Sequence, residues 1–95
     1  MYNQSMPIDF DPGKDGVNRE KHGISLAEAG RLDWSSALIW HDTRVDYRED
    51  RYGAYGLIGE RVYCVAFVLR GGVRRIISLR RANLREVRRY VSETT

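Results

Sequence analysis

The chain of 95 residues has only one cysteine and two prolines, and it has no stretch of 18 or more apolar residues. The single thiol, Cys64, cannot form an internal disulfide and lacks the further cysteines that a structural zinc site requires. Without a long apolar stretch, no segment is expected to span a membrane. The first residues lack the basic and apolar regions of a secretory signal. Together these absences favour a protein of the reducing cytoplasm.

Lysine is also scarce, and this scarcity says more about function than the lack of cysteine and of apolar stretches does. Only two of the 16 basic residues are lysines, so the chain carries 14 arginines against 13 acidic residues, with a formal net charge of +3. Residues 70–89 hold eight arginines and one acid, Glu86, whereas residues 41–51 contain four acids. Guanidinium groups bind phosphates and carboxylates through two parallel hydrogen bonds. The uneven distribution indicates a basic surface for a polyanion or an acidic partner; a solvated arginine-rich face is the alternative.

The sequence predicts one domain over residues 8–93, after an N-terminal extension over residues 1–7 in which Met6 is an alternative start. Residues 8–11 alternate between apolar and polar, as a short strand does. Asp11 and Pro12 suit the start of a helix over residues 12–22, and Gly23 suits its end. Ser25 and Glu28 have the spacing of a capping box, which predicts a second helix that ends near residues 35–36.

Four strands and a final helix are expected in the second half of the chain. The strands are predicted over residues 37–40, 52–58, 61–70 and 73–80, and the helix is capped by Asn83. Residues 61–70 are apolar on both faces, which predicts a central strand, and residues 71–72 predict a tight hairpin. Short loops favour an antiparallel meander. Leu84, Val87 and Val91 should form the buried stripe of the last helix. The expected fold is α+β, in the order β-α-α-β-β-β-β-α.

Six sequence fragments occur in a characteristic order. They are Phe10-Asp11-Pro12-x-Lys14, Asn18-x-x-Lys21-His22-Gly23-Ile24-Ser25, Glu28-Ala29, Glu49-x-Arg51-Tyr52, Gly59 and Arg75-Ile76-Ile77-Ser78-x-Arg80-x-Ala82. Taken together, they resemble the BrnT family of toxins from bacterial type II toxin–antitoxin pairs. The order and spacing of these fragments carry the resemblance, which extends from about residue 8 to residue 91. One departure is Asp33, where the family often has a large apolar residue; Trp34 beside it is expected to fill that space.

This resemblance implies a RelE-like fold, with an antiparallel sheet, two N-terminal helices and one C-terminal helix. It also implies a toxin that cleaves RNA without a metal or cofactor and thereby inhibits translation and growth. The implied partner is a BrnA-like antitoxin with a DNA-binding domain, which would neutralise the toxin and bring it indirectly to operator DNA.

Cleavage of RNA without a metal requires a base for the ribose 2′-hydroxyl, cations for the phosphate and an acid for the leaving 5′-oxygen. The catalytic candidates are Arg80, Arg51, Glu49, Lys21 and His22, and the substrate-binding candidates are Arg74, Arg70 and Tyr90. Two-residue periodicity predicts that Arg74 and Arg80 share one strand face, which Arg51 would reach from a neighbouring strand. Glu49 or Asp50 would act as the base if burial raised its pKa.

Each of these candidates also has a structural interpretation. His22 suits the C-terminal end of a helix dipole, and Lys21 can cover apolar surface with its stem. Glu49 and Arg51 can form an exposed ion pair, and Tyr90 can belong to the core. The corresponding alternative for the whole chain is a non-catalytic binding subunit, whose arginines dock an acidic antitoxin or nucleic acid without cleaving it.

Overall fold

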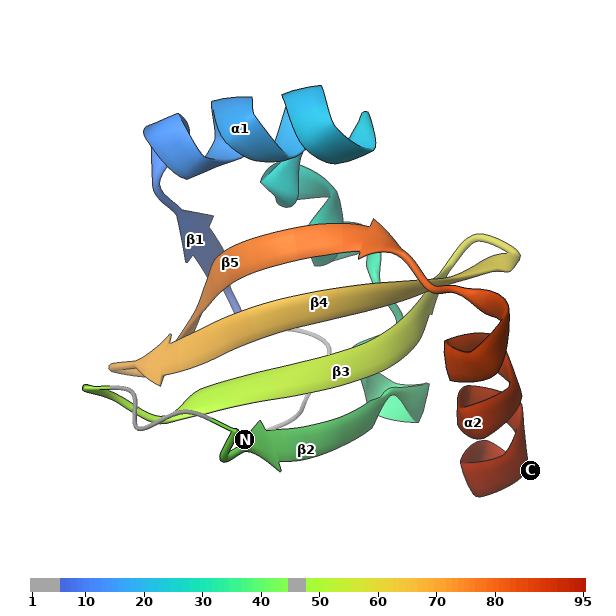
Figure 1. Ribbon diagram of the computed structural model, residues 1–95. Coiled ribbons are helices and arrows are strands. Elements are labelled where there is room, and N and C mark those ends of the chain that lie inside the picture. Colours follow the sequence, from blue (N-terminus) through green and yellow to red (C-terminus); the bar gives the residue numbers. More distant parts are fainter. Residues whose placement is uncertain (1–5, 45–47) are drawn as a thin grey trace.

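The computed structural model describes residues 6–44 and 48–95 as a five-stranded sheet with helices around it (Figure 1). The N-terminal extension predicted over residues 1–7 and the acidic segment over residues 41–51 lie partly outside these residues. The elements are β1 (Ile8–Phe10), α1 (Pro12–His22), the 3₁₀ helices η1 (Leu26–Arg31) and η2 (Trp34–Ser36), β2 (Leu38–Asp42), β3 (Arg51–Ile58), β4 (Arg61–Arg70), β5 (Val73–Arg81) and α2 (Leu84–Thr94). The α+β class is confirmed; the RelE-like arrangement implied by the resemblance stays a prediction.

The sheet has the strand order β1-β5-β4-β3-β2, so β4 is central, as its apolar sequence predicts. Strands β2 to β5 form the expected antiparallel meander. Gly71 and Gly72 join β4 to β5 with φ angles of 55° and 80°, a left-handed conformation that favours glycine in a tight hairpin. The expectation of a wholly antiparallel sheet is wrong at one edge, because β1 pairs with β5 in parallel. Local sequence could not show this pairing, since the two strands are more than 60 residues apart.

Helix α1 begins and ends where the sequence predicts. The Asp11 carboxylate accepts a hydrogen bond from the Lys14 amide at 2.9 Å, and Gly23 ends the helix with a φ angle of 70°. Asn18 then fastens the helix to the sheet. Its side-chain amide donates to the Leu79 carbonyl at 2.8 Å and accepts from the Leu79 amide at 3.1 Å. These two bonds satisfy the backbone of β5 beyond the end of the short strand β1.

The second predicted N-terminal helix is wrong as an α-helix, since residues 26–36 form only the two 3₁₀ helices. The Ser25 hydroxyl accepts from the Ala27 amide and donates to Asp15, so the expected capping box is not formed. Both short helices nevertheless deliver apolar side chains to one face of the sheet. The resulting core comprises Leu26, Ala29, Leu32 and Trp34 packed on Ala54, Ile58, Val65, Phe67, Ile76 and Leu79. Trp34, beside Asp33, is buried in this core as expected, and its ring lies edge-on to Phe67 with the two ring centroids 5.2 Å apart.

Helix α2 starts with a complete capping box, in which Asn83 and Glu86 exchange hydrogen bonds at 2.8 and 2.9 Å. The prediction that Leu84, Val87 and Val91 form the buried stripe of this helix is wrong, because Leu84 is 64% exposed and Val91 is 48% exposed. Tyr90 is buried instead, and its hydroxyl donates to the Ser36 carbonyl at 3.3 Å. The helix therefore packs on the sheet through the side that carries Tyr90.

Candidate active site

A β-bulge in β5 decides which arginines face the open side of the sheet. Ile76 pairs with Phe67 and Ser78 pairs with Ala66, so Ile77 is an extra residue in β5. The bulge reverses the alternation of side chains beyond this point. Arg74, Ile76 and Leu79 consequently point to the core beneath η1 and η2. Arg75 and Arg80 lie on the opposite face. Within residues 6–44 and 48–95, no helix covers this face between α1 and α2 (Figure 1).

Arg51 and Arg75 lie in one row across this open face. Both residues pair with Val68 of β4, Arg51 from β3 and Arg75 from β5. A residue and its partner directly across a strand pair project from the same face of a sheet. Two guanidinium groups from non-adjacent strands are therefore presented to the same side, on either flank of the buried Val68.

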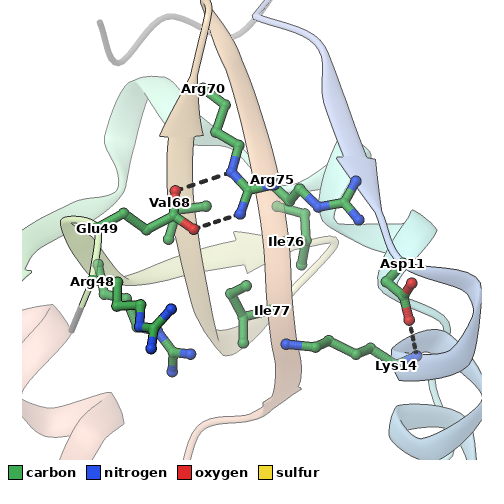
Figure 2. A pocket seen from close by; sticks show the side chains of 10 residues that line it. Asp11, Lys14, Arg48, Glu49, Val68, Arg70, Arg75, Ile76 and Ile77 are labelled. Carbon is green, nitrogen blue, oxygen red and sulfur yellow. Dashed lines mark hydrogen bonds and ion pairs between the residues drawn. The ribbon is translucent and has the colours of Figure 1, made fainter.

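A hollow of about 420 Å³ lies over this row (Figure 2). Five cationic side chains contribute to its wall, and they come from α1, from the segment before β3, and from β3, β4 and β5. The lining residues are Asp11, Lys14, Arg48, Glu49, Arg51, Val68, Arg70, Arg75, Ile76 and Ile77. Five cations converge on one hollow against two carboxylates, so its net charge is positive and favours an anion.

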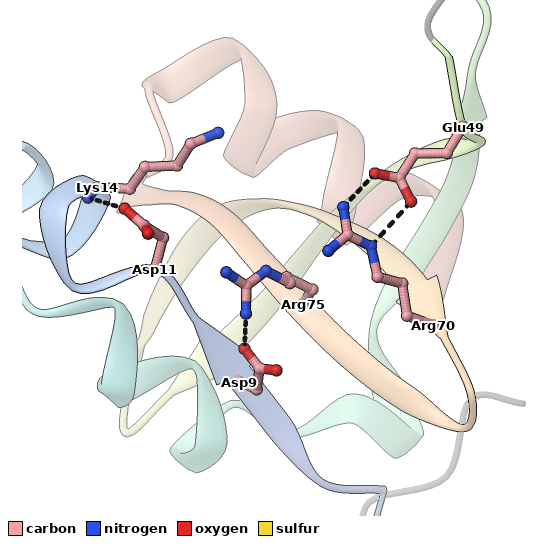
Figure 3. A network of polar contacts seen from close by, with 6 residues as sticks. All are labelled: Asp9, Asp11, Lys14, Glu49, Arg70 and Arg75. Carbon is pink, nitrogen blue, oxygen red and sulfur yellow. Dashed lines mark hydrogen bonds and ion pairs between the residues drawn. The ribbon is translucent and has the colours of Figure 1, made fainter.

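Two carboxylates of the chain hold two of these guanidinium groups (Figure 3). Arg70 donates to both oxygens of Glu49, at 3.0 Å from Nε and 2.5 Å from Nη2, and Arg75 forms an ion pair with Asp9 of β1. The hydrogen bonds from Arg70 hold the pKa of Glu49 below its ordinary value. The condition that burial raises the pKa of Glu49 is therefore not met, because this carboxylate is partly exposed and is stabilised in its charged form.

Lys14 and Arg48 complete the cationic wall. Figure 2 shows the Lys14 side chain extending from α1 toward Ile77. Neither residue forms an ion pair with an acidic side chain within residues 6–44 and 48–95. Their charges are therefore available to an incoming anion without the loss of an existing ion pair.

Lys21 and His22 line a second hollow, of about 320 Å³, between α1 and β5. Asp11, Lys14 and Ile77 line both hollows, so the two adjoin each other. The second hollow has a more apolar floor, to which the exposed Val17 contributes. Lys21 and His22 therefore lie beside the cationic hollow, while Arg51, Glu49 and Arg70 lie within its wall.

Arg80 occupies the same sheet face but belongs to another cluster. It pairs with Cys64, four residues along β4 from Val68, which corresponds to about 13 Å along the strand. Its guanidinium binds both oxygens of Glu86 at 2.8 and 2.9 Å, and this contact raises the pKa of Arg80 and lowers that of Glu86. Arg80 thereby ties the end of β5 to the first turn of α2, and it does not line the cationic hollow.

Two substrate-binding candidates are placed where a substrate does not reach them. Arg74 is fully buried on the core face, with its guanidinium carbon 4.0 Å from the centroid of the Trp34 ring. The prediction that Arg74 and Arg80 share a face is wrong, because the bulge at Ile77 lies between them. Tyr90 is 7% exposed and serves as the packing residue of α2. Its structural interpretation, membership of the core, is the one that the structure confirms.

The site residues that sequence reasoning missed are Arg75, Lys14 and Arg48. Arg75 and Lys14 both stand in fragments that carry the family resemblance, and three such fragments meet at the hollow. Membership of these fragments was the one sequence signal that pointed to Lys14 and Arg75. The fragments around Lys14, Arg51 and Arg75 are far apart in the sequence, so the sequence does not show that they meet. Arg48 belongs to no fragment, and no pattern around it points to the site.

No group of three or more potential metal ligands occurs in the part of the chain that the structure describes. The hollow offers cations rather than a cluster of carboxylates or imidazoles. The same described residues include no helix that is long and apolar enough to cross a membrane.

Comparison with known proteins places this site in a family. Among curated proteins, no sequence matches the chain. A family model described as the ribonuclease toxin BrnT of type II toxin–antitoxin systems matches residues 10–86. The match includes all the residues that line the cationic hollow, from Asp11 to Ile77. The chain therefore belongs to the BrnT family of ribonuclease toxins, and a toxin of a type II pair has a cognate antitoxin.

Proposed function

We propose that the chain is a metal-independent endoribonuclease and that the cationic hollow holds the scissile phosphate of RNA. The observation that carries this proposal is the convergence of Lys14, Arg48, Arg51, Arg70 and Arg75 on one hollow. Phosphate oxygens gain negative charge as the 2′-oxygen attacks the phosphorus. Preorganised cations around those oxygens therefore stabilise the transition state more than the ground state.

In this proposal Arg51 and Arg75 grip the non-bridging phosphate oxygens from two sides. The 2′-oxygen forms a bond to phosphorus, the bond from phosphorus to the 5′-oxygen breaks, and a 2′,3′-cyclic phosphate remains. Lys14 lies in the wall with a proton to give to the departing 5′-oxygen. Glu49 is ionised at neutral pH and so can accept the proton of the 2′-hydroxyl, although its lowered pKa makes it a weak base.

Lys21 and His22 have a supporting place in this scheme. They line the adjoining hollow, where the nucleotide next to the scissile phosphate would lie. Arg80 acts at a distance, since it orients the end of β5 and the start of α2 through Glu86.

We further propose that the antitoxin is BrnA-like and carries a DNA-binding domain. It would neutralise the toxin in the cytoplasm, where the RNA substrate is present, and the complex would reach operator DNA through that domain. Release of the toxin would then inhibit translation and growth.

The test is incubation of the purified protein with RNA in excess EDTA. We expect cleavage by the wild type and products that end in a cyclic phosphate. Arg75→Ala and Arg51→Ala should each lose most of this activity. Arg31→Ala should keep it, because Arg31 is an exposed arginine of η1 on the other side of the sheet. If EDTA abolishes cleavage, or if the Arg75→Ala and Arg31→Ala proteins cut equally well, the proposal is wrong.

One observation favours a second function, that of a non-catalytic docking subunit. The Glu49 carboxylate in the hollow has a lowered rather than a raised pKa, and its guanidinium partner Arg70 already holds it. A site built only to bind an acidic ligand would look the same. Under this alternative the wild type binds RNA or an acidic protein, Arg75→Ala weakens that binding, and no RNA is cut under any condition.

A further inference from the structure

Helix α2 lies at one end of the sheet (Figure 1), and its exposed side chains include an apolar stripe. Leu84 is 64% exposed and Val91 is 48% exposed, and Val87 is half-buried between them. Spacings of three and four residues place these side chains on one side of the helix, over a length of about 10 Å. Large apolar side chains grouped in this way on a surface indicate an interaction site.

A shallow hollow of about 240 Å³ continues the stripe. It lies between α2 and the turn from β3 to β4, and Val87 forms part of both features. The hollow is lined by Glu60, Arg61, Val62, Arg81, Ala82 and Val87. The stripe and the hollow together form one surface, called here the α2 surface, with apolar residues Val62, Ala82, Leu84, Val87 and Val91.

Three arginines border the α2 surface without an acidic partner of their own. Arg61 and Arg81 line the hollow, and Arg88 lies one helical turn after Leu84. None of the three forms an ion pair with the acidic residues of 6–44 or 48–95. Their neighbours Arg80 and Arg89 differ in this respect, since Glu86 and Glu93 hold them. The border is therefore cationic and only Glu60 opposes it.

This combination selects one kind of occupant. A second copy of the chain would bring two cationic borders together and would be repelled. RNA would satisfy the arginines but would gain little from Leu84 and Val91. An amphipathic protein segment with apolar anchors and acidic flanks satisfies both parts of the surface.

We propose that the α2 surface binds an acidic amphipathic segment of the cognate antitoxin. The proposal rests on the proposed function only in taking the antitoxin as the partner. The surface lies toward the Arg61 end of β4 and the cationic hollow toward its Arg70 end. The row of Tyr63 and Arg81 and the row of Val68 and Arg75 are about 17 Å apart along the strand. Docking on α2 therefore leaves the hollow to be blocked by another part of the antitoxin.

The test measures the affinity of the full-length chain for its full-length cognate antitoxin by calorimetry. We expect Leu84→Ser with Val91→Ser to weaken binding about tenfold or more, as loss of central apolar contacts does. Leu84→Met with Val91→Ile should bind like the wild type, because it keeps the apolar surface. Arg81→Glu with Arg88→Glu should also weaken binding. Arg19→Glu with Arg31→Glu makes the same change of charge on exposed arginines elsewhere and should have little effect.

Three results would overturn the proposal. The first is binding of the serine variant within about twofold of the wild type, a difference too small for a contact at the centre of an interface. The second is a loss of RNA affinity in Arg81→Glu with Arg88→Glu while antitoxin affinity stays unchanged. The third is a wild-type dimer in sedimentation that the serine variant converts to a monomer, which would show that a second copy covers the surface.

Folding and function are separated within the same experiment. Thermal unfolding shows whether the serine variant folds, and the charge-reversed variant tests the surface independently if it does not. Cleavage of RNA by the free variants is measured alongside and should be unchanged. A wild type that binds the antitoxin through α2 but cuts no RNA would overturn the proposed function and leave this inference standing.

Discussion

Arg51 and Arg75 are joined through one residue, because each pairs with Val68 from a different side of β4. Neither arginine is near the other in sequence, and no direct pairing connects their strands. The central strand thus sets the separation of two guanidinium groups that face one hollow. Such a scaffold holds the groups more firmly than a loop would, which is what recognition of a phosphate requires.

Replacing Glu49 with glutamine separates binding from cleavage. The change removes the negative charge that holds Arg70, so RNA should bind more tightly and with a steeper dependence on salt. If Glu49 is the base, cleavage should fall by about a hundredfold or more despite the tighter binding. Filter binding at several salt concentrations and single-turnover cleavage measure the two effects. Weaker RNA binding by Glu49→Gln would contradict the assignment of the hollow.

Replacing the adjacent residues Arg74 and Arg75 of β5 with alanine should lower the free energy of unfolding by different amounts. Arg74→Ala removes a fully buried side chain that lies against Trp34, and we expect it to lower the free energy of unfolding by about 2–4 kcal/mol. Arg75→Ala removes a partly exposed ion pair with Asp9, and we expect a loss below about 1 kcal/mol. Urea denaturation measures both. Equal losses for the two variants would show that the side chains are not on opposite faces.

Two glycine-to-alanine changes should have opposite effects on the stability of the protein. A Cβ at Gly53 would lie 2.4 Å from Cζ2 of Trp40, whose ring is held against Tyr55 at a centroid distance of 4.6 Å. We expect Gly53→Ala to destabilise the protein by about 1–3 kcal/mol. Gly16 lies inside α1 with nothing within 4 Å of the added atom, and alanine should stabilise the helix there by about 0.5–1 kcal/mol. Thermal unfolding of the two variants decides the signs.

The Arg80–Glu86 pair should make stability fall in acid. The two hydrogen bonds from Arg80 keep the pKa of Glu86 below its ordinary value of 4.5. The stabilisation is therefore complete above about pH 4.5 and is lost as the pH falls through the lower, folded-state pKa. Glu86→Gln should retain the capping bond from the Asn83 amide but lose the charge. The difference in unfolding free energy between wild type and Glu86→Gln should thus shrink as the pH is lowered, when measured by urea denaturation. A difference that stays constant would contradict this role.

Local chemistry made most of the elements predictable. Asp11, Pro12 and Gly23 act within a few residues of themselves, so the bounds of α1 follow from the sequence alone. The capping boxes show the limit of such reasoning. Ser25 and Asn83 have the same spacing to a glutamate, but the Ser25 hydroxyl is drawn to Asp15 of α1, and only the box at Asn83 forms.

The site was less predictable because its geometry depends on contacts between distant segments. Strict alternation of side chains predicted that Arg74 and Arg80 share one face of the strand. Nothing in the residues themselves reveals that Ile77 is an extra residue in β5. The parallel pairing of β1 with β5 brings Asp9 to Arg75 and carries α1, with Lys14, to the edge of the hollow. The family fragments include Lys14, Arg51 and Arg75, but only the register of the sheet shows that these residues meet.

The bulge at Ile77 makes one strand serve two environments. The extra residue lets Ile76 and Leu79 both point into the interior although they are three positions apart, and it leaves Arg75 and Arg80 on one face although they are five apart. A slip of the strand that paired Ile77 regularly would turn Leu79 outward and Arg80 inward. Stability and recognition would then be lost together. We therefore expect β5 to tolerate changes of side chain far better than a shift of its register.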